Sequence, residues 1–307
     1  MSNTAPVIEF RDLSRSYGEI SALAGLSLDV RGGEIVGLIG PDGAGKSTAM
    51  RIACALIEPN GGSALIAGFD PVTQPQQVKE HIGYMPQRFS LYPDLSVLEN
   101  LRFFADLYAV PDNEREQQEQ RLLAFSRLEP FKNRRAGQLS GGMKQKLALS
   151  CTLIHSPEIL ILDEPTTGVD PVSRQEFWSI LRELADSGKA LLVSTPYMDE
   201  AELCNRVLLM YQGATLASGT PAEIPHLFPR KIIEITGHDT AVAAQRLRQI
   251  TDTEVHRIGG KLHVIFDDEA RQAALLQQLQ DLKIQTTAIK PSIEETLVYL
   301  IQQEQAA

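Results

Sequence analysis

Residues 40–47 read GPDGAGKS and fit the pattern G-x-x-x-x-G-K-[ST]. An apolar stretch at 33–40 precedes them, and the residues from 46 to about 56 have the spacing of a helix. Glycines let a backbone curl so that its N–H groups point at an anion, and a helix N-terminus adds partial positive charge. The stretch therefore predicts a phosphate-binding loop between a buried strand and a helix, in preference to an ordinary glycine-rich turn.

Two side chains at the end of this loop suit the charged part of a nucleotide. The Lys46 ammonium can reach the outer phosphates, and the Ser47 hydroxyl can act as a ligand of Mg²⁺. Every residue of the loop, with the threonine that follows it, is a candidate contact of the phosphates. These residues are Gly40, Pro41, Asp42, Gly43, Ala44, Gly45, Lys46, Ser47 and Thr48.

A pair of acids follows another apolar stretch. Residues 159–162 read ILIL, and Asp163, Glu164 and Pro165 come directly after them. The carboxyl ends of parallel strands are where α/β proteins bind their ligands. Asp163 is predicted to hold Mg²⁺, directly or through water, and Glu164 to orient and deprotonate an attacking water. Alone, the pair is also compatible with a strand that runs out to solvent, but a neighbouring phosphate loop favours the catalytic interpretation.

The surrounding pattern predicts an α/β fold. Residues 7–88 alternate short apolar strands with turns, residues 89–155 are mostly helical in their spacing, and residues 158–228 return to strands alternating with helices. Such alternation is typical of a mostly parallel sheet covered by helices. We therefore expect a nucleotide-binding domain over residues 1–228, with a helical subdomain at about 89–155.

The residues from about Arg230 onward have their own pattern of strands and helices. Its order of elements is β-α-β-β-α-β followed by a helix, which is the order of a ferredoxin-like unit. Ser292 and Glu295 have the spacing of a capping box at the start of that last helix. The sequence predicts a small α/β domain over residues 229–307 and shows no catalytic pattern in it.

A further glycine-containing stretch, LSGGMKQK, occupies residues 139–146. A serine before two glycines can cap a helix while the bare backbone offers N–H groups to an anion. By itself this is an ordinary helix start, but it resembles the signature sequence of the ABC ATPases, usually written LSGGQ. In that family the loop reaches the ATP held by a second cassette. The resemblance therefore implies that Ser140, Gly141 and Gly142 contact ATP in a partner's site.

Three more positions follow the order of motifs in that family. Tyr17 lies where an aromatic ring stacks on adenine, Gln87 where a glutamine senses Mg²⁺ and contacts the membrane subunit, and residues 168–170 resemble the loop that ends at Asp170. Without the resemblance, these are a core tyrosine, a surface glutamine and a plain turn. The resemblance spans residues 7 to about 228 and implies ATP and Mg²⁺ as cofactors. It implies Glu164, Lys46 and Gln87 as catalytic residues, Ser47, Gln87 and Asp163 as metal ligands, and Tyr17 and Asp170 as further contacts of ATP.

Longer stretches point to one branch of the family. GYMPQRFSLYPDLSVLENLRFFADLY from residue 83, DEPTTGVDPVSRQEFW from residue 163 and PSIEETLVYLI from residue 291 look like the ATPases of ABC-2 type exporters. The likeness implies an α/β P-loop NTPase that hydrolyses ATP to power export. It also implies a peripheral place on the cytoplasmic, inner face of the cell membrane. The implied partners are a polytopic membrane subunit and a second cassette, identical to this one or not.

One position departs from the pattern of the family. Active cassettes carry a histidine after the last core strand, in a pattern like STHYMDEAE, whereas residues 194–202 read STPYMDEAE. The side chain of proline neither donates nor accepts a hydrogen bond, and its backbone lacks an N–H. We hypothesise a site that binds ATP well and hydrolyses it slowly, paired with a cassette that keeps its histidine. A homodimer that tolerates Pro196 is the alternative.

The composition narrows the classes of function. The 307 residues carry a net charge of −10, which argues against a general nucleic-acid binder, so we expect no nucleic-acid partner. No apolar run approaches the roughly 18–20 residues that span a bilayer, and the N-terminus lacks the plan of a signal peptide, so we expect a cytosolic chain. The three cysteines form no CxxC pair and the histidines lack metal-ligand spacing, which predicts reduced thiols and no zinc site.

Two other functions stay open at the level of sequence. A soluble ABC protein that acts on ribosomes or DNA usually carries two cassettes or long insertions, and this sequence shows neither pattern. A regulatory nucleotide switch, in which ATP binding alone controls assembly, is less unusual with a proline at position 196. Hydrolysis measured in the assembled complex separates the switch from the transporter.

Overall fold

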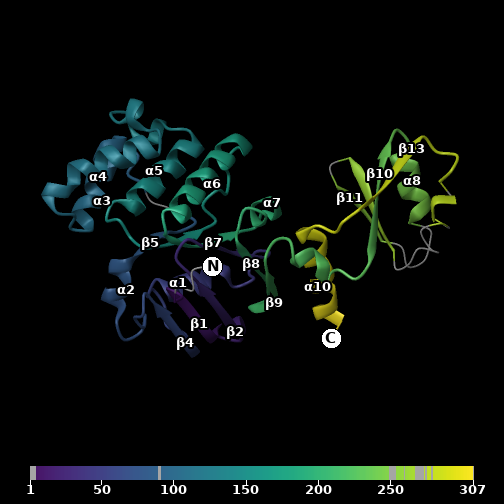
Figure 1. The fold of residues 1–307 in the computed structure, drawn as a ribbon, viewed down its shortest axis with the longest axis horizontal. Coiled ribbons are helices and arrows are strands. Elements are labelled where there is room, and N and C mark those ends of the chain that lie inside the picture. The colour runs from purple at the N-terminus through teal and green to yellow at the C-terminus, as the bar shows by residue number, and fades with distance from the viewer. Residues whose placement is uncertain are drawn as a thin grey trace. The chain divides into compact units, whose positions relative to one another are not determined.

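The computed structural model describes residues 5–88, 91–248, 254–258, 260–266, 273, 275–277 and 279–306. The chain divides into two compact units, Met1–Pro221 and Ala222–Ala307, which are purple to green and green to yellow in Figure 1. The sequence places residues 222–228 in the first domain, whereas in the structure they belong to the second unit, because Phe228 packs against Ile232 and Ile265 there.

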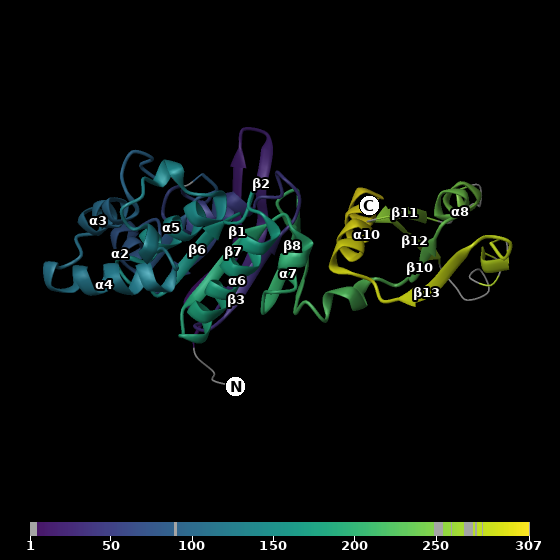
Figure 2. The ribbon, with the colours of Figure 1, turned by 90° about the horizontal axis from the view of Figure 1, so that it is seen from above.

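A six-stranded sheet forms the centre of the first unit. Neighbouring strands run parallel from β5 to β8, and only β9 is antiparallel to its neighbour. Three of the parallel strands are buried along their whole length, as strands covered on both faces are, and Figure 2 shows α6 against β7. The predicted α/β fold is therefore confirmed. In sheet order the strands are β5 (Ile82–Met85), β6 (Ile159–Asp163), β7 (Ala190–Thr195), β3 (Ile35–Ile39), β8 (Arg206–Tyr211) and β9 (Ala214–Gly219).

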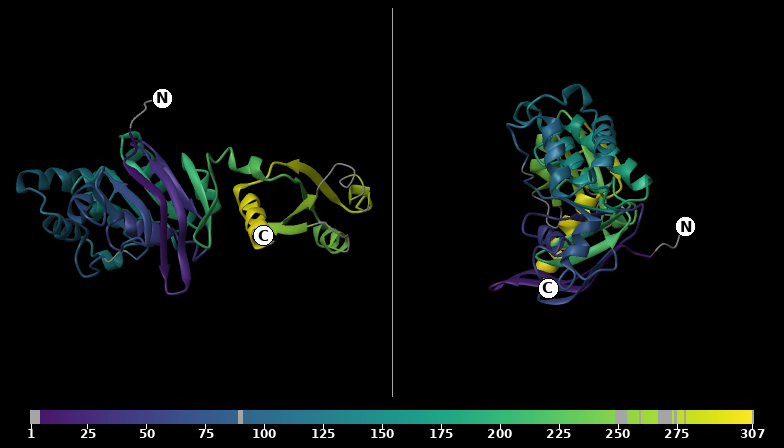
Figure 3. Two further views of the ribbon diagram at one scale, coloured as in Figure 1. Left: turned by 90° about the horizontal axis from the view of Figure 1, so that it is seen from below. Right: turned by 90° about the vertical axis from the view of Figure 1, so that its left-hand side faces the viewer.

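A separate antiparallel sheet in the order β2-β1-β4 shares one hydrophobic core with the central sheet and α1, and its β1–β2 hairpin is the long purple ribbon in Figure 3. The apolar patterns of residues 7–17 and 26–30 predict β1 and part of β2, but the sequence does not predict the separate sheet or β4. β4 opens on two glycines, and a Cβ at Gly62, where φ is +78°, would lie 2.4 Å from the Asp12 carbonyl oxygen. The bounds are β1 (Ile8–Tyr17), β2 (Ile20–Val30), α1 (Lys46–Ala53) and β4 (Gly61–Ile66).

The helical subdomain follows the predicted pattern with one shifted start. Ser96 and Glu99 form a reciprocal capping box that begins α3. The narrow apolar stripe of residues 115–128 predicts a helix that starts at Arg115, whereas α4 begins at Asp112. Pro111 takes the N-cap position, where its missing N–H leaves no helical hydrogen bond unmade. The helices of the first unit are α2 (Pro75–His81), α3 (Val97–Leu107), α4 (Asp112–Phe125), η1 (Glu129–Phe131), η2 (Ala136–Gln138), α5 (Gly141–Leu153), α6 (Pro171–Asp186) and α7 (Met198–Ala201).

The second unit is built on a four-stranded antiparallel sheet in the order β11-β12-β10-β13. One hydrophobic cluster contains Ile233, Leu247 and Val264, and so joins α8 to the sheet. Another contains Phe228 and has Tyr299 of α10 packed against it. The bounds are η3 (Ile224–Leu227), β10 (Lys231–Gly237), α8 (Thr240–Leu247), β11 (Glu254–Ile258), β12 (Lys261–Phe266), β13 (Ile284–Ile289) and α10 (Ile293–Ala306).

The start of α10 has the predicted capping box, which is confirmed. The Ser292 N–H donates to Glu295 Oε2 at 2.6 Å, and the Glu295 N–H donates to Ser292 Oγ at 3.2 Å. In the sequence, Gly259–Gly260 predicts a turn between two strands, and residues 268–282 predict a helix. Gly259 and most of residues 268–282 lie outside the described residues. Within the described ranges, no helix is long and apolar enough to cross a membrane.

Candidate nucleotide-binding site

The phosphate-binding loop joins the end of β3 to the start of α1. Gly43 and Gly45 adopt φ angles of +80° and +103°, in the left-handed region that favours glycine. A Cβ at Gly45 would also lie 2.3 Å from the Ala22 carbonyl oxygen. Gly45 is the N-cap of α1, and within the described part of the chain no side chain caps that helix. The first backbone N–H groups of α1 are therefore open to an anion.

The Lys46 ammonium is folded back over its own loop. Its Nζ donates to the carbonyl oxygens of Gly40 and Pro41, at 2.7 and 3.0 Å, and lies 3.8 Å from Glu164 Oε1. Burial lowers the pKa of Lys46, and the nearby carboxylates of Glu164 and Asp42 oppose that shift. Charge-assisted hydrogen bonds to phosphate are stronger than bonds to neutral carbonyls, so a nucleotide can draw Lys46 away from the loop.

Asp163 ends β6 and gathers two hydroxyl groups around one carboxylate oxygen. Its Oδ1 accepts from Ser47 Oγ at 3.1 Å and from Ser194 Oγ at 2.6 Å. Ser194 reaches this place because β6 and β7 are paired in a register that sets Asp163 beside Ser194. Carboxylate and hydroxyl oxygens are ligands that Mg²⁺ prefers. The residues Ser47 and Asp163 therefore fit the predicted metal site.

Glu164 combines an uncommon backbone conformation with a side chain held by two donors. Its φ of +48° lies in the left-handed region, which costs a non-glycine residue about 1 kcal/mol or more. The Glu164 N–H donates to Ser194 Oγ at 2.9 Å, which stabilises that conformation. Its Oε2 accepts from Gln87 Nε2 at 2.8 Å and from Thr167 Oγ1 at 3.2 Å. The structure thus brings Gln87, Lys46 and Glu164 together, and it adds Ser194 and Thr167, which the sequence analysis missed.

The loop opens into a pocket of about 460 Å³ that also reaches Tyr17. The Tyr17 side chain is 44% exposed, so its ring is accessible to a ligand. An exposed aromatic ring and a phosphate loop in one pocket match the two ends of a nucleotide. Gly40 and Pro41 bind Lys46 through their carbonyls and are not among the described lining residues. Those lining residues are Tyr17, Ile20, Ala22, Asp42, Gly43, Ala44, Gly45, Lys46, Ser47, Thr48, Gln87 and Glu164.

The signature-like loop lies at the start of α5, and the loop that ends at Asp170 lies at the start of α6. Ser140 Oγ accepts from the Met143 N–H at 3.3 Å, and Asp170 Oδ1 accepts from the Ser173 N–H at 3.0 Å, so each residue caps its helix. The bond from Ser173 lowers the pKa of Asp170. A Cβ at Gly142 would lie 2.5 Å from the Ser173 side chain, so the two helix starts touch. Of the described residues that line the phosphate pocket, none comes from these two loops.

The chain leaves β7 through Thr195 and Pro196, and a buried carboxylate holds this exit in place. Glu200 is 1% exposed, and its Oε2 accepts from Thr195 Oγ1 at 2.5 Å. Its Oε1 accepts from Thr166 Oγ1 at 2.7 Å and from Arg174 Nε at 3.1 Å. The exit from β7 is therefore tied to the loop that follows β6 and to the start of α6. The sequence analysis did not single out this network.

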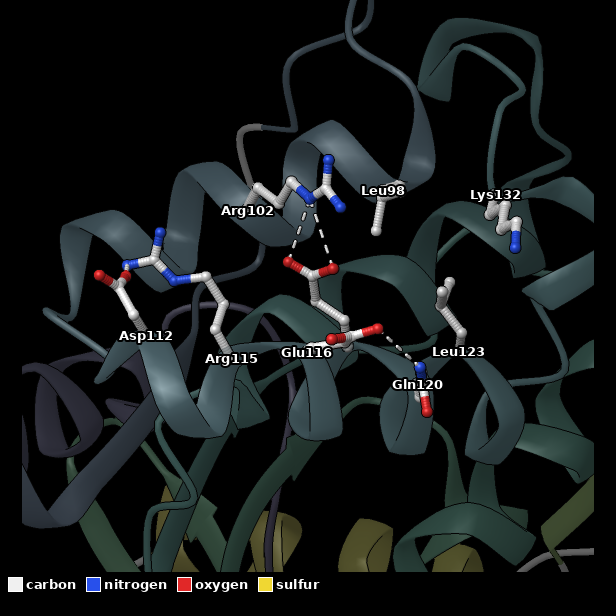
Figure 4. A pocket seen from close by; sticks show the side chains of 9 residues that line it. Leu98, Arg102, Asp112, Arg115, Glu116, Gln120, Leu123 and Lys132 are labelled. Atoms are coloured by element: carbon white, nitrogen blue, oxygen red, sulfur yellow. Dashed lines mark hydrogen bonds and ion pairs between the residues drawn. The ribbon is translucent and has the colours of Figure 1, made fainter.

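A larger hollow of about 580 Å³ lies in the helical subdomain (Figure 4). Arg102 Nε lies 3.2 and 3.3 Å from the two carboxylate oxygens of Glu119, and Gln120 Nε2 donates to Glu116 Oε1 at 3.3 Å. Its described lining has charges of both signs and no glycine loop. The described lining of the hollow therefore lacks a glycine loop like the one at Lys46, whose backbone suits phosphates, and we place the nucleotide in the smaller pocket.

Known proteins resemble this chain over the same motifs. The ABC transporter family pattern matches residues 23–167. The probable multidrug ABC transporter ATP-binding protein YbhF of Escherichia coli K12 is 44% identical over 262 residues, covering 81% of this chain and 44% of that protein. The Nod factor export ATP-binding protein I of Rhizobium etli is 35% identical over 302 residues, covering 97% of this chain and 94% of that protein. The chain belongs to the ABC transporter family.

Solved structures of ABC cassettes share the fold of this ABC protein. An ATP-binding subunit of an ABC transporter matches with a TM-score of 0.65 and 32% identity, covering 72% of this chain and 92% of that one. The cassette MJ0796, a dimer in a post-hydrolysis state bound to ADP and Pi, matches with a TM-score of 0.62 and 27% identity, covering 69% of this chain and 98% of that one. The predicted ABC ATPase fold is confirmed by these likenesses.

The family and the enzyme class predicted from the sequence are confirmed, so the chain is an ABC ATPase. The predicted likeness to ATP-binding proteins of exporters is confirmed as well. The chain spans less than half the length of YbhF and almost the whole length of the Nod factor export protein. Multidrug and Nod factor transport are attributes of those relatives.

Proposed function

We propose that this ABC ATPase binds ATP with Mg²⁺ and hydrolyses it to drive an exporter in a cell membrane. One observation carries the proposal: a buried lysine and a carboxylate meet at one pocket, with Lys46 Nζ 3.8 Å from Glu164 Oε1. The lysine supplies positive charge for the outer phosphates, and the carboxylate supplies a base for water. Phosphoryl transfer requires both, because it depends on positioning and charge stabilisation.

Ser47 and Asp163 are the residues that would hold Mg²⁺ in this site, with the Gln87 amide close by. When bound, the ion neutralises charge on the phosphate oxygens. The chain itself contributes the alignment of the ligands. Ser194 holds Asp163 Oδ1 at 2.6 Å, and Gln87 is held by its bond to Glu164 at 2.8 Å.

Glu164 acts on water in the proposed reaction. The water oxygen forms a bond to the γ-phosphorus, and the bond from that phosphorus to the bridging oxygen of ADP breaks. Glu164 accepts the proton of the water and later returns it to solvent. Gln87 and Thr167 fix the carboxylate through Oε2, which directs Oε1 toward the Lys46 side of the pocket. Lys46 and the open N–H groups of α1 stabilise the negative charge that develops.

A second cassette completes the proposed ATP site. Ser140, Gly141 and Asp170 are exposed, and none of them is among the described residues that line the Lys46 pocket. A capped helix start with exposed glycine N–H groups suits an anion, which here is the ATP of a partner cassette. The dimeric structure of the related cassette MJ0796 supports this arrangement.

A groove beside the ATP pocket is the proposed contact with a polytopic membrane subunit. It measures about 380 Å³, and Gln87 lines both the groove and the ATP pocket. A related cassette, cbiO1 of Clostridium perfringens, is part of a transporter complex, which supports such a partner. We propose that the chain lies at the inner face of the membrane, bound to this subunit. The other described lining residues are Arg88, Leu91, Pro93, Ala136, Gly137, Lys144, Gln145 and Ala148.

The site built on this chain is proposed to hydrolyse ATP slowly, because Pro196 stands in the position of the family's histidine. Within the part of the chain that the structure describes, Glu164 pairs through its side chain with Lys46, Gln87 and Thr167, and none of these is a histidine. Loss of one transition-state contact typically lowers a rate by about a hundredfold to a thousandfold. A partner cassette with the histidine would turn over faster while using this chain's signature loop.

Pro196 also favours a second function, a nucleotide switch in which ATP binding alone controls assembly. A homodimer that tolerates the proline and turns over slowly lies between the two functions. Turnover in the assembled complex separates them. A switch predicts no more ADP than a Glu164→Gln variant forms, whereas a transporter predicts ADP formation that rises when the membrane subunit is present.

The first test is a pull-down from native membranes with a tagged Glu164→Gln chain. The chain is held with ATP and Mg²⁺, solubilised in mild detergent, and its partners are identified. A polytopic membrane protein in stoichiometric amount supports the transporter, and a second cassette with the histidine supports the asymmetric pair. Recovery of ribosomes, of DNA or of no partner contradicts the proposal. A Lys46→Ala chain is the matched control, because it should not be held closed by ATP.

A further inference from the structure

We propose that Arg15 is a positioning residue that holds the Tyr17 ring ready for the nucleobase and thereby strengthens ATP binding. The inference rests on the proposed ATP site, because Tyr17 lines that pocket. Neither the motifs nor the likenesses described above assign a role to Arg15. It is not among the described residues that line the pocket, so its effect on a nucleotide has to pass through another side chain.

The guanidinium of Arg15 covers one face of the Tyr17 ring. The two residues lie two positions apart on β1, which places their side chains on the same side of the strand. The guanidinium carbon lies 5.0 Å from the centre of the ring, within the range of a cation–π interaction. The ring belongs to the pocket lining and the guanidinium does not. The ring therefore has a cation on one face and offers the other face to a flat ligand.

Arg15 is itself anchored to the connection between α1 and β4. Its NH1 group donates to the Glu58 carbonyl oxygen at 2.9 Å in that connection. The next residue, Ser16, donates its N–H to Asn60 Oδ1 at 2.7 Å in the same connection. Since this connection follows the helix that begins at Lys46, these bonds link the strand that carries Tyr17 to the segment that carries the phosphate loop.

The surroundings of Arg15 Nε indicate that the side chain stacks on a ring and does not form a hydrogen bond through this atom. Arg15 Nε is buried and has no hydrogen-bond partner among the residues that the structure describes. A buried donor without a partner is unfavourable, so the side chain must gain stability in another way. A guanidinium stacks on aromatic faces, and here the Tyr17 ring provides that contact.

Restraint of the ring before ATP arrives lowers the entropy that binding has to remove. Exposed cation–π contacts are weak, so the expected effect on ATP affinity is about two- to tenfold. The effect should be confined to ligands that carry a base. Inorganic tripolyphosphate has the phosphates of ATP without the base, and its affinity should depend on Lys46 and its loop alone.

The test is calorimetric titration of the full chain with ATP and, separately, with inorganic tripolyphosphate. For Arg15→Ala we expect about fivefold weaker ATP binding and unchanged tripolyphosphate binding. Arg15→Lys should recover part of the loss, because an ammonium keeps the charge without the planar stacking surface. Arg11→Ala is the matched control, since Arg11 lies on the same strand but pairs with Glu9 at 2.9 Å at the surface. The control should bind both ligands like the parent chain.

A double-mutant cycle decides whether Arg15 acts through Tyr17. Tyr17→Leu should weaken ATP binding, and Arg15→Ala added to it should cause no further loss. The proposal is overturned by an equal loss for both ligands, by no loss, or by losses that add. If the parent chain binds tripolyphosphate but not ATP, the base end is wrongly assigned. If it binds neither, the ATP site of the proposed function is itself wrong. If Arg15→Ala does not fold, Arg15→Lys provides the same comparison.

Discussion

The strands β6 and β7 are parallel neighbours, with Asp163 at the end of β6 beside Ser194 near the end of β7, yet the two strand ends carry different chemistry. β6 passes into Glu164, whose carboxylate is held by Gln87 and Thr167. β7 passes into Pro196, whose side chain has no group that can donate or accept a hydrogen bond. The end of β6 therefore provides a positioned base, whereas the Pro196 side chain after β7 provides no hydrogen-bonding group.

Several buried hydrogen bonds nevertheless hold the residues around the end of β7 in place. Ser194 binds Asp163 and the Glu164 N–H, and Glu200 holds Thr195. The proline thus interrupts none of the bonds that align the two strand ends. The comparison teaches that strand register and buried hydrogen bonds set the geometry of such a site, whereas a single side chain supplies or withholds the chemistry.

The largest expected effect comes from removing the base at the end of β6. Glu164→Gln should lower ATP turnover by about a hundredfold to ten-thousandfold, because a positioned general base typically contributes that much. ATP affinity should stay close to that of the parent chain, since the amide keeps the shape. Turnover by phosphate release and affinity by titration check this. Glu183→Gln, on the exposed side of α6, is the control and should leave both unchanged.

Introducing a histidine at position 196, after the end of β7, should have the next largest effect on ATP turnover. Pro196→His should raise turnover at least about tenfold, because an added transition-state contact recovers part of the loss that its absence causes. Pro196→Ala is the matched control, since it removes the proline without adding an imidazole. Phosphate release in the assembled complex is the measurement. An unchanged rate in the histidine variant would show that position 196 does not limit hydrolysis.

Weakening the hydrogen bonds that Glu200 makes around the exit from β7 should reduce the stability of the fold. Glu200→Gln should lower the free energy of unfolding by about 2 kcal/mol, because it weakens charged hydrogen bonds to Arg174, Thr166 and Thr195. Denaturant unfolding measures the change. Asp199→Asn is the control: its side chain also binds Arg174, at 2.6 Å, but is 73% exposed, so the loss should stay within about 1 kcal/mol. Equal losses would contradict the special role of the buried carboxylate.

The smallest effect concerns the second unit, where His263 and the Ser292 N–H hold the Glu295 carboxylate. Burial of Glu295 raises its pKa, but hydrogen bonds from the Ser292 N–H and the His263 ring outweigh burial and lower the pKa of Glu295 overall. Its contribution is therefore fully present above the ordinary value of about 4.3 and is lost as the pH falls through the lowered pKa. We expect about 1 kcal/mol of stability to disappear over that window. Denaturant unfolding across the window, followed on the second unit, is the measurement, and Glu295→Gln should flatten its pH profile.

The sequence predicts best those residues whose function depends on local chain geometry. GPDGAGKS needs only a strand before it and a helix after it, so the loop at 40–47 is placed correctly. The same holds for the capping box at Ser292 and Glu295. Asp163 and Glu164 follow from the apolar strand 159–162.

Residues that depend on the pairing of distant strands were not predictable in this way. Ser194 reaches Asp163 only because β6 and β7 are neighbours in register, and that pairing is not written in either strand alone. Glu200 joins segments that are 26 and 34 residues apart in the sequence. The strand β4 was missed because its two leading glycines look like a turn, although the close approach to Asp12 requires one of them.

Gln87 lines two adjacent pockets, and this has a thermodynamic consequence. If filling one pocket shifts Gln87, the free energy of filling the other changes, and the change is the same in whichever order the two are filled. A membrane subunit whose affinity rises by some factor when ATP is bound must raise the affinity for ATP by that same factor. Measuring the affinity for ATP with and without the membrane subunit therefore gives the coupling free energy between ATP binding and subunit binding.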